Sequence, residues 1–140
     1  MKHEWRRHEK DLYGAKHFPR IVNIPAQQFI MADGKGNPNG PDFSAKVTAL
    51  YSLAYAIKMI YKDTSVSGAL HDYTVYPLET FWKKADTKKP DEPVSFQKMD
   101  LFAKENNLKR SDNYHKEIYL NHENHVVKSK LKTILRYCIE

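Results

Sequence analysis

Apolar residues recur every three or four positions in the middle of the chain, which is the spacing of one face of an α-helix. The positions that form this stripe are Phe43, Val47, Leu50, Ala54, Ile57 and Tyr61. Asp42 comes directly before the stripe and is a residue type that caps helix N-termini. The pattern therefore predicts a long helix that begins after Asp42 and continues to Tyr61.

A second helical pattern lies in SFQKMDLFAKENN, residues 95 to 107. Its apolar positions again follow helical spacing, and they are Phe96, Met99, Phe102 and Ala103. Asn106 or Asn107 can end this helix, because asparagine tolerates the left-handed backbone conformation that closes many helices.

Four segments have the composition or the alternation of apolar and polar residues that is typical of β-strands. They are RIVNIPAQQFIMA (20–32), DYTVYPLE (72–79), HKEIYL (115–120) and LKTILRYCI (131–139). Pro77 lacks the backbone N–H that a central strand uses, so the second of these strands is expected to end, or become an edge, there. The predicted fold class is α+β, an antiparallel sheet with two helices.

Segments of turn and linker composition divide the chain, which we expect to form a single domain over 1–140. Residues 1–19 form an N-terminal arm, with a short helix held by Trp5 and Leu12. Residues 20–82 form a first repeat, and residues 94–140 hold what remains of a second. Between them, 83–93 (KKADTKKPDEP) is rich in lysine and proline, the composition of a linker.

Composition narrows the protein class. The chain has 140 residues, 41% of them hydrophobic, and a chain of that size can bury about 68–70% of its unfolded surface. No apolar run approaches the roughly 20 residues that span a bilayer, and the charged N-terminus lacks the apolar stretch of a signal peptide. The single cysteine, Cys138, cannot form an internal disulfide. We therefore expect a soluble, cytoplasmic protein without a membrane partner, and Cys138 in the core.

The formal net charge of +6 raises the alternative of nucleic-acid binding. We favour a solvated basic surface over a specific nucleic-acid site, because no helix-turn-helix, zinc-finger or RNA-binding signature accompanies the charge. The histidines His115, His122 and His125 lack the spacing of a known metal motif, and the glycines of GKGNPN (34–39) do not complete a phosphate-binding loop. We expect neither a metal nor a cofactor.

The two halves of the chain share a short similarity. Aligning TVYPL (74–78) with EIYLN (117–121) matches Tyr76 to Tyr119 and places Thr74 where Glu117 stands. If the halves are related by a pseudo-twofold axis, Tyr76, Tyr119 and Glu117 converge on one cleft. A carboxylate among aromatic rings suits a cationic or polarised organic ligand, because ring faces attract cations by about 0.5–2 kcal/mol.

The chain also resembles a known family. The strings GKGNPN, LYSLAYAIKM (50–59), DYTVYPLE with Trp82, HKEIYL and KLKTILRY (130–137) are similar to those of GyrI-like small-molecule-binding domain proteins. The resemblance implies two βαββ repeats of SHS2 type, as in the ligand-binding domains of bacterial multidrug-responsive regulators. It also implies an aromatic pocket with a buried glutamate, which corresponds to Glu117. Tyr76, Trp82 and Tyr119 would line that pocket.

The resemblance implies two activities. Members bind small organic molecules, and some hydrolyse cyclopropane-containing, DNA-alkylating compounds. In a hydrolase, Glu117 would act as general base on water while the strained ring lies against the tyrosines and Trp82. Without the resemblance, we would interpret Glu117 as a strand carboxylate that faces solvent. We interpret Glu79 as a surface or turn carboxylate, with a second acid or base role as the alternative.

The chain departs from the family pattern in its middle. The segment that would join the two repeats, with the strands on either side of it, is missing between the YPLE region and residues 91–99. Loss of two strands leaves open sheet edges, which a homo-oligomer could cover. A third reading is therefore a shortened remnant without a complete pocket.

Overall fold

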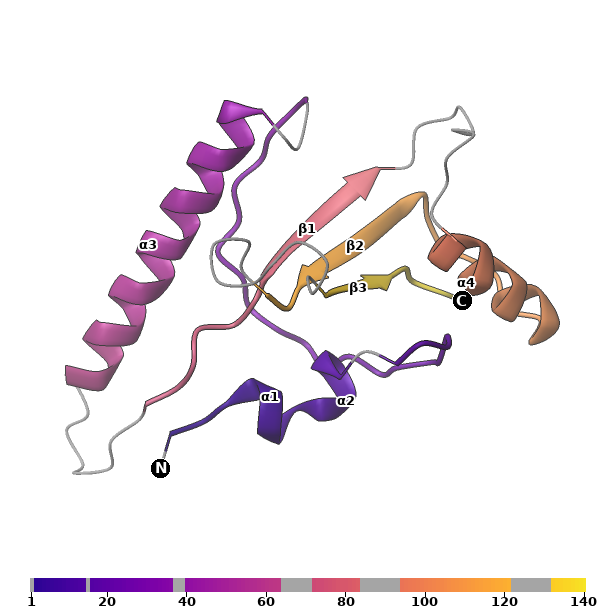
Figure 1. The fold of residues 1–140 in the computed structure, drawn as a ribbon, viewed down its shortest axis with the longest axis horizontal. Coiled ribbons are helices and arrows are strands. Elements are labelled where there is room, and N and C mark those ends of the chain that lie inside the picture. The colour runs from indigo at the N-terminus through magenta and orange to yellow at the C-terminus, as the bar shows by residue number, and fades with distance from the viewer. Residues whose placement is uncertain (1, 15, 37–39, 64–71, 84–93, 122–131) are drawn as a thin grey trace. The chain divides into compact units, whose positions relative to one another are not determined.

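In the computed structural model, residues 2–14, 16–36, 40–63, 72–83, 94–121 and 132–140 are described. They form two compact units, each described by itself. The first comprises residues 1–12 and 23–76, and the second comprises residues 13–22 and 77–140. The long helix lies in the first unit and the sheet in the second (Figure 1).

The first unit is built on helix α3 (Pro41–Asp63) and the short helix α1 (Trp5–His8). Helix α3 confirms the helix predicted from the apolar stripe, but it begins at Pro41, so Asp42 is not the residue before the helix. Asp42 lies in the first turn instead, where Lys46 pairs with it at 2.8 Å. The arm is held as expected at Trp5, which is 4% exposed and whose indole N–H donates to the Val75 carbonyl at 2.9 Å.

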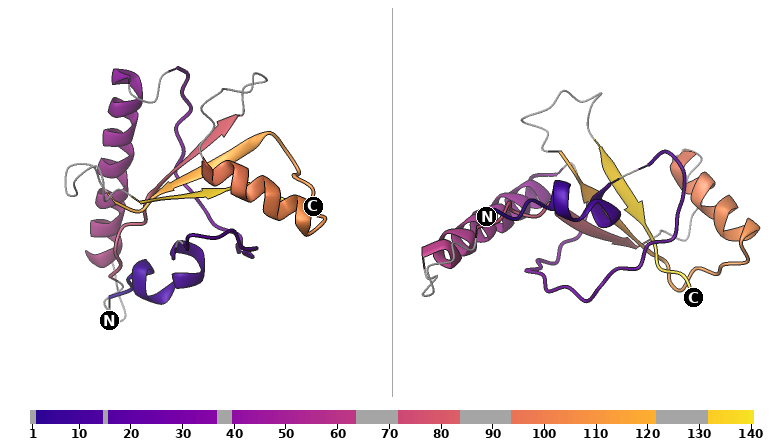
Figure 2. Two further views of the ribbon diagram at one scale, coloured as in Figure 1. Left: turned by 45° about the vertical axis from the view of Figure 1, so that its right-hand side comes forward. Right: turned by 90° about the horizontal axis from the view of Figure 1, so that it is seen from below.

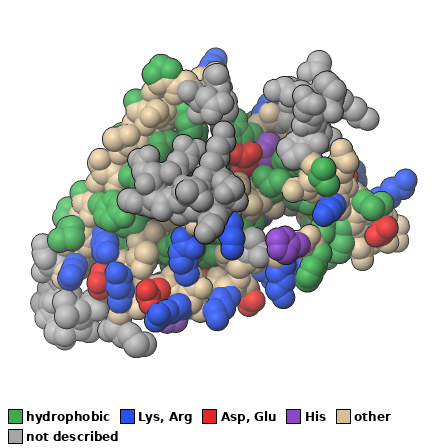
Figure 3. Space-filling model, viewed as in Figure 1, with side chains coloured by type: hydrophobic (Ala, Val, Ile, Leu, Met, Phe, Trp, Pro, Cys, Tyr) green, Lys and Arg blue, Asp and Glu red, His purple; other side chains and the backbone are tan. Residues whose placement is uncertain are grey.

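Part of the surface of α3 is apolar and exposed. Figure 3 shows hydrophobic side chains along this helix, and the exposed ones are Leu53, Tyr55, Ile57, Met59, Ile60 and Tyr61. The N-terminal half of the predicted stripe is partly covered, whereas Ile57 and Tyr61 at its C-terminal end are 45% and 51% exposed.

The second unit contains a three-stranded antiparallel sheet in the order β1-β2-β3 (Figures 1 and 2). Strand β1 spans Leu78–Lys83, β2 spans Tyr114–Tyr119 and β3 spans Thr133–Arg136. Helix α4 (Val94–Glu105) precedes β2, and the short helix α2 (Lys10–Tyr13) ends where this unit begins. Asn107 has a φ of 54°, so the left-handed residue predicted after α4 is confirmed.

Among the described residues of the second unit, few apolar side chains are buried, and Tyr13, 6% exposed, is one of them. Ile118 is completely buried, Leu120 is 7% exposed, and Ala103 of α4 is 9% exposed. Helix α4 contacts the sheet through two aromatic residues: Phe96 meets the His115 ring, and the Tyr137 hydroxyl donates to Asp100 at 3.2 Å.

Two strand predictions are wrong. Residues 20–32 form no strand. Five of the six large hydrophobic residues in this segment are more than 40% exposed: Ile21, Ile24, Phe29, Ile30 and Met31. The strand expected in DYTVYPLE (72–79) was predicted to end at Pro77, whereas β1 begins at Leu78, one residue after it. Tyr73 forms only an isolated parallel bridge with His3.

The α+β class, the antiparallel sheet and the two longer helices are confirmed. Strand β3 lies within its predicted segment, and β2 overlaps its own but begins one residue earlier, at Tyr114. Of the predicted linker 83–93, Lys83 is the last residue of β1, and 84–93 lie outside the described residues. Cys138 follows β3 and is exposed rather than in the core. Within the described ranges, no helix is both long enough and apolar enough to cross a membrane.

Candidate functional site

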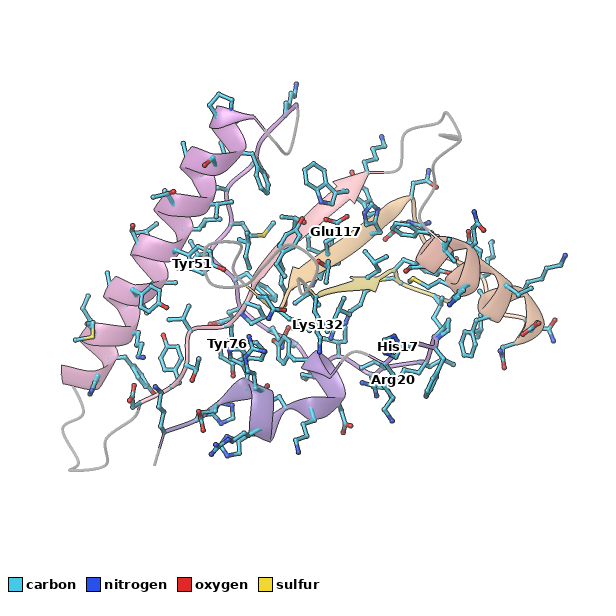
Figure 4. The ribbon with its side chains drawn as sticks, in the orientation of Figure 1. His17, Arg20, Tyr51, Tyr76, Glu117 and Lys132 are labelled. Atoms are coloured by element: carbon cyan, nitrogen blue, oxygen red, sulfur yellow. The ribbon has the colours of Figure 1, made fainter. Side chains whose placement is uncertain are left out.

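The register of β1 with β2 places three pairs of residues on one face of the sheet. Thr80 lies opposite Glu117, Trp82 opposite His115, and Leu78 opposite Tyr119. Because side chains alternate between faces along a strand, these six share a face. We call them the Glu117 face; Figure 4 shows the Glu117 side chain on β2.

Glu117 is the polar centre of this face. The Tyr119 hydroxyl donates to Glu117 Oε2 at 2.5 Å, and the Oγ1 of Thr80 lies 3.1 Å from the same hydroxyl. His115 Nε2 lies 3.3 Å from Glu117 Oε1. Both carboxylate oxygens therefore have a hydrogen-bonding neighbour, and the side chain keeps 26% of its exposure.

Tyr119 is held in its protonated form. Burial raises the pKa of its phenol above the ordinary value, and the hydrogen bond to Glu117 and the Glu117 charge raise it further. Hydrogen bonds with Thr80 and Trp82 act in the opposite direction but do not outweigh these causes. At neutral pH, Tyr119 therefore remains a donor to the carboxylate.

Three of the four predicted ligand-binding residues lie on this face, namely Trp82, Glu117 and Tyr119. Tyr76 belongs to the first unit, where its hydroxyl donates to Glu9 Oε2 at 2.7 Å. Its position beside Glu117 stays a prediction, as do the site roles of the other three residues.

Glu9 is a carboxylate that the sequence did not single out. Besides Tyr76, His3 Nε2 lies 3.0 Å from its Oε2. Desolvation by burial acts to raise the pKa of Glu9, but the hydrogen bonds from His3 and Tyr76 and the charges of His3 and His8 outweigh it. The net effect is a lowered pKa, so this small cluster favours the charged carboxylate.

The opposite face of the sheet carries a second charged group. Glu79 is only 8% exposed and pairs with Lys116 at 3.0 Å, so its predicted surface position is wrong. Lys116 lies directly opposite Arg136 of β3 and above the Phe81 ring, at 4.7 Å from its centroid. Glu79 and Glu117 therefore lie on opposite faces and do not form a pair of acid and base.

The sequence missed Thr80 and His115 as members of the Glu117 face. His115 had a signal, because residues 115, 117 and 119 alternate with the strand period and must share a face. Thr80 had none, because its position depends on the register of β1 with β2. Of the three histidines weighed as a metal site, His122 and His125 lie outside the described residues; in the remainder, no cluster of ligands suited to a metal occurs.

No protein-family model and no curated protein matches the chain. Solved structures do resemble it. One is of a hydrolase from Listeria innocua, 26% identical, with 100% of both chains covered and a TM-score of 0.81. Another is of an uncharacterized conserved protein from the same organism, 22% identical, with 99% of this chain and 100% of that chain covered and a TM-score of 0.83.

A further hydrolase from Listeria innocua is 23% identical, with 99% of this chain and 100% of that chain covered and a TM-score of 0.79. These similarities extend over nearly the whole chain, so the α+β fold is one that other proteins share.

Proposed function

We propose that this protein binds a small organic ligand, either aromatic or cationic and amphipathic, in the manner of GyrI-like proteins, with Glu117 as the polar anchor. One observation carries the proposal: a partly exposed carboxylate that accepts a 2.5 Å hydrogen bond from Tyr119 on a face shared with Trp82. The family strings in the sequence support it independently.

The chemistry of the Glu117 face favours a cation. The indole and phenol rings present π-faces that attract cations, and the carboxylate supplies the counter-charge. Tyr119 fixes the orientation of the carboxylate, so little side-chain entropy is lost when a ligand binds. An anionic ligand would face repulsion from the same carboxylate.

Ligand-induced thermal stabilisation tests this role. We expect a permanent aromatic cation, trimethylphenylammonium, to raise the melting temperature of the wild-type protein, and Glu117→Gln to weaken its affinity about tenfold, as expected when a charged partner becomes neutral. Glutamine keeps the size of the side chain and still accepts from Tyr119. Glu105→Gln is the matched control, because Glu105 is exposed at the end of α4. An equal response in the wild type and Glu117→Gln would remove Glu117 from the proposed site.

Hydrolysis at the same site is the second candidate. The hydrolase that is 26% identical over the whole chain favours it. Glu117 would take a proton from water while the water oxygen bonds to a carbon of a strained ring, such as a cyclopropane conjugated to a carbonyl group. The electron pair of the broken ring bond moves to the conjugated carbonyl oxygen, which takes up the proton from Glu117, so one water is added overall. Tyr119, still protonated, would hold the base in place.

The wild type and Glu117→Gln also distinguish hydrolysis from ligand binding without turnover. Incubation with a cyclopropane-containing electrophile, followed by mass spectrometry, would show a product heavier by one water if hydrolysis occurs. Turnover by the wild type that is absent in Glu117→Gln would establish catalysis. Saturable binding without turnover would leave ligand binding as the function.

A further inference from the structure

His115 is the neighbour of Glu117 that the proposed function does not use. Its side chain is 16% exposed, and its Nε2 lies 3.3 Å from Glu117 Oε1. The Phe96 ring of α4 meets the imidazole edge-on, with ring centroids 4.8 Å apart. In the sheet register, Trp82 stands directly opposite. The imidazole therefore lies against the Phe96 ring and next to the Glu117 carboxylate, with Trp82 as its register neighbour on β1.

The two partners of Glu117 differ in how their charge can change. The raised pKa of Tyr119 keeps that phenol neutral at physiological pH. Histidine is the side-chain type that ordinarily gains or loses a proton between about pH 5 and 8. His115 is thus the partner whose proton can alter the net charge next to the carboxylate.

Among the residues that face His115, Glu117 is the charged group whose interaction with a ligand a proton on the imidazole would change. On β2, Glu117 is its ion-pair partner. Thr80 and Trp82, which β1 places on this face, carry no charge. On α4, Phe96 faces the ring, and Asp100 one turn later accepts a hydrogen bond from Tyr137. Lys116 is on the other face of the strand, where it pairs with Glu79.

We propose that His115 determines the charge of the ligand that the Glu117 face accepts, because a bound cation and the proton on His115 compete for the same carboxylate. This inference rests on the proposed function and deepens it. With a protonated imidazole, the Glu117 charge is already compensated, and a second cation would be repelled. With a neutral imidazole, the carboxylate is available to the ligand.

The affinity of the Glu117 face for a cation should depend on pH, and it should increase as the pH rises. The affinity for a cation rises between pH 5.5 and pH 8.0, by about tenfold, which is the size of effect that neighbouring charges commonly produce. The affinity for a neutral molecule of the same shape stays constant. Trimethylphenylammonium and its neutral carbon isostere tert-butylbenzene form a suitable pair, because neither titrates in this range.

NMR titrations of both probes at the two pH values test the inference in three proteins. These are the wild type, His115→Gln, which keeps a hydrogen-bond donor without a titratable proton, and His17→Gln. His17 is exposed on the segment before residue 20 and serves as the matched control. We expect the pH dependence to be lost in His115→Gln and kept in His17→Gln. His115→Asn, which also lacks a titratable proton, serves as a second variant and should lose the pH dependence in the same way.

The outcomes separate the inference from the function beneath it. Failure of trimethylphenylammonium to bind the wild type at pH 8.0 would overturn the proposed function and this inference with it. Cation binding that is equal at both pH values would overturn the inference and leave the function standing. The same holds if His115→Gln keeps the full pH dependence. The pH dependence of cation binding by His115→Asn decides the matter if His115→Gln does not fold.

Discussion

Tyr119 shows how one hydroxyl can serve both stability and site geometry. It donates to Glu117 and shares a hydrogen bond with Thr80 on the neighbouring strand, so it links β1 to β2 through side chains. A phenol in this position must remain protonated to keep both contacts. Burial, and after it the hydrogen bond to Glu117, raises the pKa of Tyr119 and keeps the phenol protonated.

Replacement of Tyr119 by phenylalanine should destabilise the protein by about 1–2 kcal/mol at pH 7, because a partly buried carboxylate loses its donor. The folded-state pKa of Tyr119 lies above the unfolded value. Its contribution is therefore complete below about pH 10 and is lost as the pH rises through the folded pKa. Urea unfolding should show that the difference in unfolding free energy between the wild type and Tyr119→Phe is smaller at alkaline pH than at pH 7.

Tyr114→Phe is the control for this experiment, because Tyr114 lies on the same strand but is 46% exposed. We expect that variant to match the wild type at both pH values within about 0.5 kcal/mol, as surface substitutions usually do. A stability difference for Tyr119→Phe that stays constant into the alkaline range would contradict the assigned role of the phenol.

At the scale of the elements, the sheet separates two glutamates that the sequence could not distinguish. Glu117 faces one side with hydrogen-bonding neighbours and partial exposure, while Glu79 faces the other, buried against Lys116. The cations Lys116 and Arg136 stand directly opposite each other on β2 and β3, an arrangement that is unfavourable by itself. Burial lowers the pKa of Arg136, and the charge of Glu79 opposes that shift.

The substitution Glu79→Gln should therefore destabilise the protein by about 1–3 kcal/mol, because two facing cations lose the carboxylate that compensates them. Urea denaturation at pH 7 measures this loss. The control is Glu140→Gln, since Glu140 pairs with Lys109 at 3.8 Å with both side chains more than half exposed, and exposed pairs contribute little. Equal stability of the two variants would show that Glu79 does not compensate the facing cations.

Some elements of this fold can be predicted from the sequence and others cannot. Helices α3 and α4 follow from local periodicity, and Asn107 ends α4 as its side-chain type suggests. Strand pairing is not local, so alternation over 20–32 did not reveal that most of its large side chains would stay exposed. Pro77 was assigned to the end of a strand, whereas it lies just before the first residue of one, where a missing N–H is also tolerated.

The residues of the candidate site likewise fall into those that the sequence can predict and those that it cannot. The period of two along β2 is enough to put Glu117, Tyr119 and His115 on one face. The addition of Thr80 and Trp82 requires the register between β1 and β2, which depends on contacts nearly forty residues apart in the chain. The family resemblance supplied Trp82 without that register, whereas Thr80 appeared only in the structure.

At the scale of the whole molecule, the chain passes between the two compact units three times. Residues 1–12 belong to the first, 13–22 to the second, 23–76 to the first and 77–140 to the second. Each unit is therefore completed by segments that are distant in sequence. A unit composed this way cannot be cut out as one continuous piece, so we expect the two to unfold together, as a single domain would.

The two tryptophans test this expectation directly, because Trp5 lies in the first unit and Trp82 in the second. Trp5→Phe and Trp82→Phe leave one fluorescent reporter in each unit. In urea, each variant's fluorescence should change at the same midpoint as its own circular dichroism, in one cooperative transition, with the protein monomeric by ultracentrifugation. Because the two signals are compared within one variant, the effect of the substitution on stability does not influence the comparison.

If fluorescence and circular dichroism gave different midpoints in either variant, the units would be separate folding units. If no cooperative transition occurred in the monomer, the shortened-remnant reading would be favoured, because a chain that folds alone needs a complete core.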